Sequence, residues 1–474
     1  MCLAAALVAT PAAANGRFPG ARQIAIGPTD PSSLLLRTTF GQMLSRDGGQ
    51  SFHWVCEQVI GYGGTQDPAV AITADGSLIN TAYEGTSVTH DGGCSWAFAD
   101  GLASRYSVDV ALDPAAPARA LVVAAADASH GLPAQCWETT DSGQHWAVRS
   151  AFPAGFFPQN VDLARSRPGR VYATGLQTLS SGSTQATLLR SDDGGTTWVT
   201  RTVPTEAGRS AYLSAVDPAD ENLLYARVEG GDEDTLLRSA DGGESWSTLI
   251  SLPGGMLGFA LSPDGGRIAI GGPSAGVLVA SRESAASFVV RSATPVTCLA
   301  WGMEGLYACG VDELSSGFAM GRSSDEGATF APVLAALGDT CGPLTTCAAA
   351  SPYAATCPAL WPGIDATLRK NTPSLACGQV GTASGGAGTS GGPGATGGTG
   401  PAVTPGDDED GGCHAAQGGS RPVDIFPMAL FLAAAHLARR SARGRHRLRQ
   451  FHQRPRRAIS GVNGRKTGLF VARP

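Results

Sequence analysis

Lysine is nearly missing from this chain of 474 residues, which contains only Lys370 and Lys466. Charged residues of all kinds make up 16% of the sequence, against about 25% in typical soluble domains. Almost every basic residue is therefore an arginine. We interpret this bias as a consequence of the base composition of the genome, and it carries no information about binding.

Acidic residues are absent from residues 439–474, which hold 12 of the 34 basic residues of the chain. The first 438 residues therefore carry all 40 acidic residues and only 22 basic ones. The net negative charge of these 438 residues repels the phosphate backbone of a nucleic acid, so we do not expect a nucleic-acid partner.

Metal and nucleotide motifs are also lacking. The 11 cysteines include no C-x-x-C pair, and the histidines show neither H-x-x-x-H nor H-E-x-x-H spacing. Glycine-rich pieces such as Gly271-Gly272-Pro273 are not followed by lysine and a helix. We therefore expect no cofactor and no metal. Cysteines in this number without metal spacing instead indicate disulfides and an oxidising compartment.

One short motif occurs seven times, with the form Ser/Thr-x-Asp-x-Gly-x-Ser/Thr-Trp/Phe. One of the seven copies, at Glu283, is degenerate. The acidic residue of the motif follows at steps of 42 to 52 residues and stands at Asp47, Asp91, Asp141, Asp193, Asp241, Glu283 and Asp325. Each unit contains about four strand signals, which in the fifth unit cover 212–216, 223–228, 235–238 and 245–250. Four antiparallel strands repeated seven times predict an all-β fold, a seven-bladed β-propeller over residues 15–340.

The residue types of the motif suit a hairpin turn between the third and fourth strands of a blade. The aspartate and the Ser/Thr hydroxyl accept hydrogen bonds from turn N–H groups, and glycine allows a positive φ. The aromatic residue then packs beside the neighbouring blade. Carboxylates spaced around a ring cannot meet at one substrate, so we predict a structural role for Asp47, Asp91, Asp141, Asp193, Asp241 and Asp325.

This motif resembles the Asp box, or BNR repeat, of the sialidase-like propellers, over about residues 15–337. The resemblance implies that the boxes lie on the rim of the propeller, away from the central pocket. Members of that group include sialidases, xyloglucan-active glycosidases, sortilin-type receptors, photosystem assembly factors and exported binding proteins. The resemblance is thus specific for the fold and weak for the function.

Ligands of propellers usually meet the loops that lead into the innermost strands. Those loops lie near Arg22, Asp67, Arg105-Tyr106, Gln159-Asn160, Arg209, Gly255 and Thr294, and from them we predict ligand-binding roles for Arg22, Asp67, Arg105, Tyr106 and Arg209. Sialidases hold a carboxylate with three arginines, which suits the guanidinium fork. The alternative is that these arginines are solvated.

A catalytic set cannot be assembled from the sequence. A glycosidase needs two facing carboxylates, or a Tyr–Glu pair with a carboxylate acid. Tyr212 and Tyr225 fall in predicted strands, and Glu206 and Glu229 border loops without an assigned partner. The catalytic residues therefore remain unknown.

The cysteines allow several pairings, because connectivity cannot be deduced from sequence. Cys298 and Cys309 fall on adjacent predicted strands of the last blade, and Cys56 and Cys94 are plausible partners in neighbouring blades. Cys136 is then left over. Residues 341–380 are predicted to form a small disulfide-stapled segment that contains Cys341, Cys347, Cys357 and Cys377.

The two ends of the chain carry export signals. Residues 1–14 resemble the second half of a secretory signal peptide, with a cleavage site at Ala12-Ala13-Ala14. Residues 381–412 have the Gly/Ser/Thr/Pro composition of a flexible linker. Cys413, an apolar run and paired arginines follow, and residues 413–440 resemble the myxobacterial MYXO-CTERM sorting signal. That resemblance implies processing at Cys413, with a basic tail at 441–474.

Together these features predict an exported cell-surface propeller, a monomer that binds a glycan or protein ligand without catalysis. The membrane is expected as a partner only through the C-terminal anchor. A secreted sialidase-type glycoside hydrolase is the first alternative, and an assembly or scaffold factor of envelope complexes is the second.

Overall fold

The computed structural model describes residues 18–63, 67–283 and 287–369. The chain divides into two units, 1–386 and 387–474, and every described residue belongs to the first. The predicted signal peptide at 1–14, the linker at 381–412, the Cys413 segment and the basic tail lie outside the described residues. Among the described residues, no helix is both long enough and apolar enough to cross a membrane.

The described residues form seven sheets of four antiparallel strands, in which strands that are consecutive in the chain pair with each other. Blade 1 contains β1 (Ala21–Ile26), β2 (Leu34–Thr38), β3 (Gly41–Ser45) and β4 (His53–Val55). Blade 2 contains β5 (Ala69–Ile72), β6 (Leu78–Ala82), β7 (Gly85–Thr89) and β8 (Ala97–Phe98). Blade 3 contains β9 (Ser107–Leu112), β10 (Ala120–Ala124), β11 (Gln135–Thr139) and β12 (Ala147–Ala151). Blade 4 contains β13 (Phe156–Leu163), β14 (Val171–Thr178), β15 (Thr184–Ser191) and β16 (Val199–Thr202).

Blade 5 contains β17 (Ala211–Val216), β18 (Leu224–Val228), β19 (Glu233–Ser239) and β20 (Ser247–Pro253). Blade 6 contains β21 (Gly258–Leu261), β22 (Arg267–Gly272), β23 (Gly276–Ser281) and β24 (Val289–Ser292). Blade 7 contains β25 (Val296–Gly302), β26 (Gly305–Gly310), β27 (Met320–Ser323) and β28 (Ala331–Leu334). The helices are α1 (Glu57–Ile60), α2 (Glu313–Ser316), the 3-10 turn η1 (Leu337–Asp339) and α3 (Pro352–Leu368).

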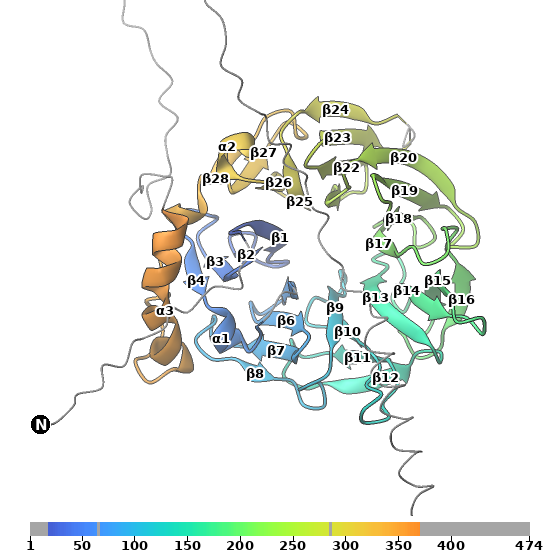
Figure 1. Cartoon of the computed structure of the whole chain (residues 1–474), viewed down its shortest axis with the longest axis horizontal. Helices are drawn as coiled ribbons and strands as arrows, with labels where there is room; N and C mark the ends of the chain where they lie inside the picture. Colours follow the sequence, from blue (N-terminus) through green and yellow to red (C-terminus); the bar gives the residue numbers. More distant parts are fainter. Residues whose placement is uncertain (1–17, 64–66, 284–286, 370–474) are drawn as a thin grey trace, which may run out of the picture. The chain divides into compact units, whose positions relative to one another are not determined.

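The seven sheets form a ring, and the first strand of each blade is the innermost (Figure 1). The first strands of neighbouring blades contact one another all the way round, including β25 with β1. The predicted seven-bladed β-propeller is therefore confirmed. Because the strands alternate in direction, the loops between blades and the turns between second and third strands share one face, here called the upper face.

The repeated turns between third and fourth strands lie on the opposite, lower face, and their hydrogen bonds explain the motif. In blade 5, the Ser239 hydroxyl donates to Asp241 Oδ1 at 2.7 Å, and the Gly243 N–H donates to Ser239 Oγ at 2.8 Å. The Ser245 N–H and hydroxyl donate to the two Asp241 oxygens at 2.9 and 2.5 Å. Both carboxylate oxygens are thus engaged inside the turn.

The glycine of the turn lies against the preceding blade. Gly243 has φ +90° and Gly49 has φ +91°. A Cβ atom on Gly243 would lie 2.1 Å from Leu188 Cδ2 of blade 4, and one on Gly49 would lie 2.3 Å from Val333 Cγ1 of blade 7. The turn therefore joins adjacent blades as well as reversing the chain, which explains why the motif repeats once per blade.

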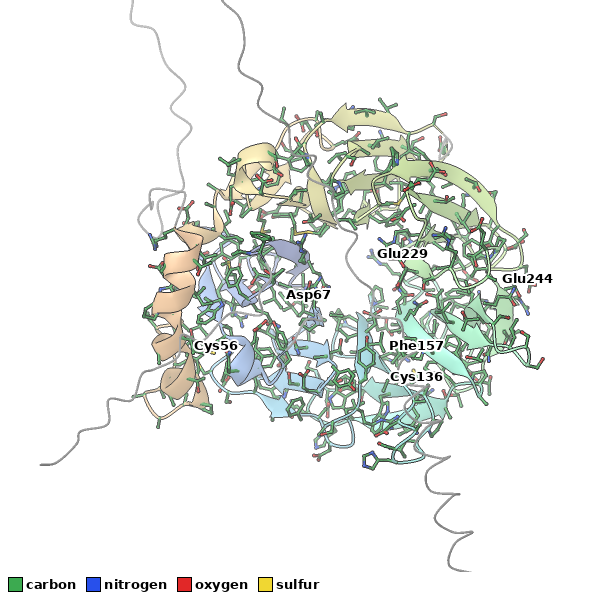
Figure 2. All side chains as sticks on the ribbon, viewed as in Figure 1. Cys56, Asp67, Cys136, Phe157, Glu229 and Glu244 are labelled. Atoms are coloured by element: carbon green, nitrogen blue, oxygen red, sulfur yellow. A yellow bond between two sulfur atoms is a disulfide. The ribbon has the colours of Figure 1, made fainter. Side chains whose placement is uncertain are left out.

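The disulfides differ from the sequence prediction in one important way. Cys298 pairs with Cys309 as predicted, and Cys136 is free and buried. The predicted Cys56–Cys94 pair is wrong, because Cys56 bonds Cys357 and Cys94 bonds Cys347. Figure 2 shows Cys56 next to α3.

The Cys-rich segment predicted after the propeller lies, over its described residues, against blade 1. After blade 7 the chain passes along the outer strand of blade 1, with a parallel bridge between Trp54 and Pro343. Helix α3 then packs on that blade, and Tyr353 is completely buried there. Cys347 and Cys357 bond this segment to the propeller, and its apolar residues pack against the core cluster of blade 1.

Candidate functional site

A cavity of about 440 Å³ lies on the axis of the ring. It is lined by residues of the first strands of six blades, among them Arg22 of β1, Asp109 of β9 and Tyr212 of β17. Arg227, on the neighbouring β18, also lines it. We refer to this space as the axial cavity.

Side chains of the axial cavity link the inner strands, whose backbones do not form a common ladder. Asn160 Nδ2 donates to the Leu213 carbonyl at 2.8 Å, and the Leu213 N–H donates back to Asn160 Oδ1 at 3.2 Å. Asp109 Oδ2 accepts from the Val161 N–H at 3.0 Å. Polar side chains thus satisfy backbone groups that no neighbouring strand reaches.

Two carboxyl groups that link inner strands, those of Asp109 and Asp162, have strongly shifted pKa values. Burial raises the pKa of Asp109 to about 7, and the charge of Asp162 adds to the rise. Burial likewise raises the pKa of Asp162 to about 6, and its carboxylate accepts from the Val216 N–H at 3.1 Å. Asp109 therefore carries a proton for much of its time near neutral pH, within a cavity that opens to solvent.

A row of aromatic rings follows the upper face from blade 2 to blade 4. The Tyr83 and Tyr106 rings lie with centroids 5.4 Å apart, and the Tyr106 and Phe157 rings 6.1 Å apart. Tyr83 is 67% exposed in the turn between β6 and β7, while Tyr106 and Phe157 are half-buried. We call these three residues the aromatic row.

Tyr212 lines the axial cavity. Burial raises its pKa, with a further rise from the charge of Glu229 and a small one from the charge of Tyr106 in the aromatic row. The Arg227 guanidinium lies over its ring at 5.0 Å from the centroid. Gln159 Nε2 donates to the Tyr212 hydroxyl at 3.3 Å. Aromatic and polar groups therefore adjoin here, as in sites for amphipathic ligands.

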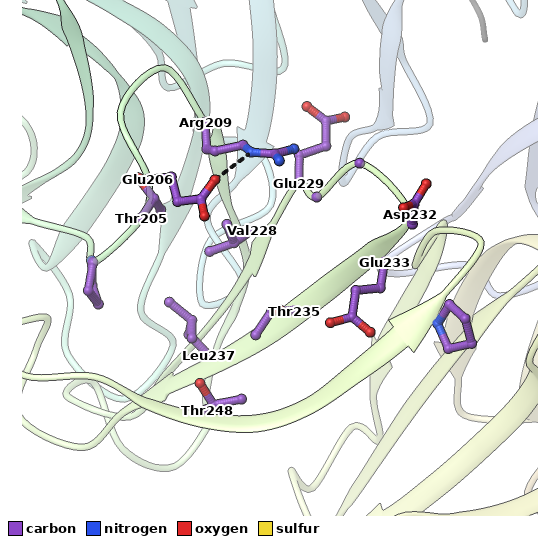
Figure 3. A pocket seen from close by; sticks show the side chains of 14 residues that line it. Thr205, Glu206, Arg209, Val228, Glu229, Asp232, Glu233, Thr235, Leu237 and Thr248 are labelled. Atoms are coloured by element: carbon purple, nitrogen blue, oxygen red, sulfur yellow. Dashed lines mark ion pairs between the residues drawn. The ribbon is translucent and has the colours of Figure 1, made fainter.

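A second cavity of about 590 Å³ lies in blade 5, between the loop before β17 and the turn between β18 and β19 (Figure 3). Four acidic residues line it, namely Glu206, Glu229, Asp232 and Glu233. Arg209 lies among them and pairs with Glu206 at 3.5 Å. Val228 and Leu237 add apolar surface.

The predicted ligand-binding residues are not gathered in one place. Arg22 lines the axial cavity and Tyr106 belongs to the aromatic row. Asp67 pairs with Arg37 at 3.4 Å on the inner side of the ring (Figure 2). Arg209 lies in the blade 5 cavity. Arg105 is only 5% exposed and donates to Gln135 Oε1 and, at 2.9 Å, to the Pro133 carbonyl. The three arginines therefore do not form a common grip on one carboxylate.

Sequence reasoning missed Tyr83, Phe157, Asp109 and Arg227. Tyr83 and Phe157 stand next to upper-face turns, so a search for aromatic residues at those turns in consecutive units would have found them. Asp109 and Arg227 alternate with apolar residues in their strands, and this pattern does not reveal which side faces the axis. Within the described part of the chain, no group of three or more histidine, cysteine or acidic residues is placed to hold a metal ion.

No protein-family model matches the sequence, and no curated protein matches it either. Solved structures similar to this chain include a GH74 enzyme of Niastella koreensis, with 14% identity over 66% of this chain and 71% of that one and a TM-score of 0.29. The structure of YCF48 bound to D1 peptide shows 15% identity over 52% of this chain and 72% of that one, with a TM-score of 0.36. A puromycin-hydrolyzing peptidase of Mycobacterium tuberculosis shows 16% identity over 67% and 56%, with a TM-score of 0.45.

The chain spans only 38% of another similar structure, an ancestral GH74 enzyme, at 14% identity and a TM-score of 0.42. Identities this low transfer no activity to this chain.

Proposed function

We propose that this chain is an exported β-propeller that binds a glycan on its upper face without chemical conversion. The observation that carries the proposal is the aromatic row, whose Phe157 lies on β13, the strand that also brings Gln159 and Asn160 to the polar axial cavity. Sugar rings have an apolar C–H face that packs on the electron-rich face of an aromatic ring. Tyr83, at 67% exposure, offers such a face to solvent.

The axial cavity supplies the polar part of such a site. Arg22 offers guanidinium donors, and Gln159 Oε1 is a buried acceptor with no hydrogen-bond partner among the described residues. A hydroxyl-rich ligand satisfies both kinds of group, whereas an apolar ligand would leave them unpaired. A protein ligand is the alternative occupant of the same face.

Export is part of the same proposal. Three disulfides join described cysteines, which suits an oxidising compartment. In this account residues 1–14 are a signal peptide, Cys413 belongs to a MYXO-CTERM-type sorting signal, and the repeated turns are Asp boxes of the sialidase-like propellers. The hydrogen bonds within the turns support the last assignment.

A glycoside hydrolase is the second candidate function, and one observation favours it. Asp109, with a pKa of about 7, lines the same cavity as Tyr212, whose pKa responds to the charge of Glu229. An acid that holds its proton near neutral pH and a Tyr–Glu pair are components of a glycosidase.

The test uses the full chain and a panel of soluble polysaccharides in affinity electrophoresis, together with fluorogenic glycosides. We expect retardation by at least one polysaccharide, weakened in Tyr83→Ala and Phe157→Ala, and no turnover. The control is Val148→Ala, which removes a 46% exposed apolar side chain from the outer strand β12. Turnover of a glycoside by the wild type that disappears in Asp109→Asn would show that the protein is a hydrolase. If no polysaccharide retards the wild type, the result would favour a protein ligand.

A further inference from the structure

The boundary between blades 7 and 1 differs from the other six boundaries of the ring. Each of the others is crossed by the chain itself, which runs from the last strand of one blade to the first strand of the next. Blades 7 and 1 each take all four strands from one end of the propeller, and no strand of one pairs with the sheet of the other. We call this boundary the seam.

The direct contacts across the seam join β1 to β25 and β26 at the axis, and the repeated turn of blade 1 to Val333 of β28 at the outer edge. Strand β1 packs on β25, and the Thr297 hydroxyl donates to the Ala21 carbonyl at 2.9 Å. A Cβ atom on Gly302 would lie 2.9 Å from Ile26 Cδ1, which shows how closely the two strands approach. These contacts are side-chain contacts, so they lack the cooperativity of a backbone ladder.

Residues 340–369 cross the seam on the outside of the ring. The Cys341 N–H donates to the Phe52 carbonyl at 2.8 Å, and the Trp54 N–H donates to the Gly342 carbonyl at 2.8 Å. The Tyr353 hydroxyl donates to the Trp54 carbonyl at 2.6 Å. The segment thus extends from blade 7 and hydrogen-bonds to the outer strand of blade 1.

Two disulfides fix this segment to the far side of the seam. Cys357 bonds Cys56, just after β4, and Cys347 bonds Cys94 in the repeated turn of blade 2. Their sequence separations are 301 and 253 residues, whereas Cys298–Cys309 spans 11 residues inside one hairpin of blade 7. Because a disulfide that closes a longer loop removes more unfolded-state entropy in the chain-entropy model, these two act on closure of the whole ring.

We propose that residues 340–369 are a covalent clasp that holds the ring closed at the seam and makes the upper-face site conditional on oxidation. The axial cavity is lined from both sides of the seam, by Arg22 and Ile24 of β1 and by Leu299 of β25. When a thiol or phosphine reductant converts each of the two clasp disulfides into a pair of thiols and is itself oxidised, β1 and β25 separate while the remaining blades stay folded, and the cavity is dismantled.

The test is hydrogen exchange of the full chain in the oxidised wild type and in two double variants, Cys56→Ser/Cys357→Ser and Cys94→Ser/Cys347→Ser. We expect β1 amides to exchange at least about tenfold faster in the clasp variants, since local opening sets exchange rates. Amides of β17 and β18, in blade 5, should keep their wild-type rates. The control Cys136→Ser replaces a buried free cysteine of blade 3, away from the seam, and should leave β1 unchanged.

Equal acceleration in every blade would overturn the proposal, because the disulfides would then support global stability only. Unchanged exchange at β1 would overturn it as well. If the variants do not accumulate, the oxidised wild type is reduced in its folded state with tris(2-carboxyethyl)phosphine and sampled over time. Early exchange at β1 ahead of β17 supports the clasp, and simultaneous exchange contradicts it.

Discussion

Gly243 of blade 5 lies so close to Leu188 of blade 4 that a Cβ atom would stand 2.1 Å from Leu188 Cδ2. Leu188 is fully buried and cannot turn away. We predict that Gly243→Ala lowers the free energy of unfolding by about 2–4 kcal/mol, from overpacking and an alanine at positive φ. Urea denaturation measures the change. Gly48→Ala is the control, because Gly48 has φ +72° with nothing within 4 Å of its Cβ position, so it should cost only about 1 kcal/mol. Equal losses would contradict packing between blades as the reason for the glycine.

Asp241 should stabilise the fold in a pH-dependent way. Hydrogen bonds from Ser245, first the hydroxyl and then the N–H, lower its pKa to about 2. The folded state therefore favours the carboxylate, so the stabilisation is complete above about pH 4 and is lost as the pH falls towards 2. We predict that Asp241→Asn loses about 1 kcal/mol at pH 7, and that the difference from wild type shrinks at pH 2.5. Urea titrations at both values check this, and a difference that is independent of pH would count against it.

Asp109 should act with the opposite sign. Burial raises its pKa to about 7 in the folded state, so the folded protein binds one proton more than the unfolded chain between about pH 4 and 7. The contribution of this group to stability is therefore lost as the pH rises through that range. We predict that wild-type stability falls more steeply from pH 4.5 to 7.5 than that of Asp109→Asn. Asp264→Asn is the control, because hydrogen bonds from Ser262 and Gly266 lower the Asp264 pKa and leave it ionised throughout this range. Parallel slopes for wild type and Asp109→Asn would refute the assignment.

The sequence was sufficient for the architecture because each blade repeats one turn whose residues are all required locally. Ser239, Asp241, Gly243 and Ser245 bond within seven residues, so their spacing alone predicts the turn. The four strands predicted for the fifth unit correspond to β17–β20 with shifts of up to three residues at their ends. The order of strands in each unit was also enough to predict which strand is innermost, because it is the first strand of every blade.

The site and the disulfides could not be predicted in the same way. Arg105 and Tyr106 are adjacent in sequence, yet Arg105 turns into blade 3 and Tyr106 joins the aromatic row. Such a choice depends on neighbours from other blades. Cys56 and Cys94 find partners in a segment about 250 to 300 residues away, whose path depends on the Trp54 edge of blade 1. No local pattern records that path.

The aromatic row makes the most direct prediction about function. Tyr106 contacts both Tyr83 and Phe157, so its loss both removes a ring and loosens the other two. We predict that Tyr106→Ala weakens glycan binding by at least about tenfold, the equivalent of 1.4 kcal/mol. Tyr106→Phe, which keeps the ring, should bind within about twofold of wild type.

Affinity electrophoresis of the full-length wild type, Tyr106→Ala and Tyr106→Phe against one retained polysaccharide is the measurement that tests this account most directly. The account predicts that Tyr106→Phe stays retarded and that Tyr106→Ala migrates as it does in a gel without polysaccharide, with unfolding midpoints showing that both variants are folded. Undiminished retardation of folded Tyr106→Ala, or no retardation of the wild type by any polysaccharide, would contradict it.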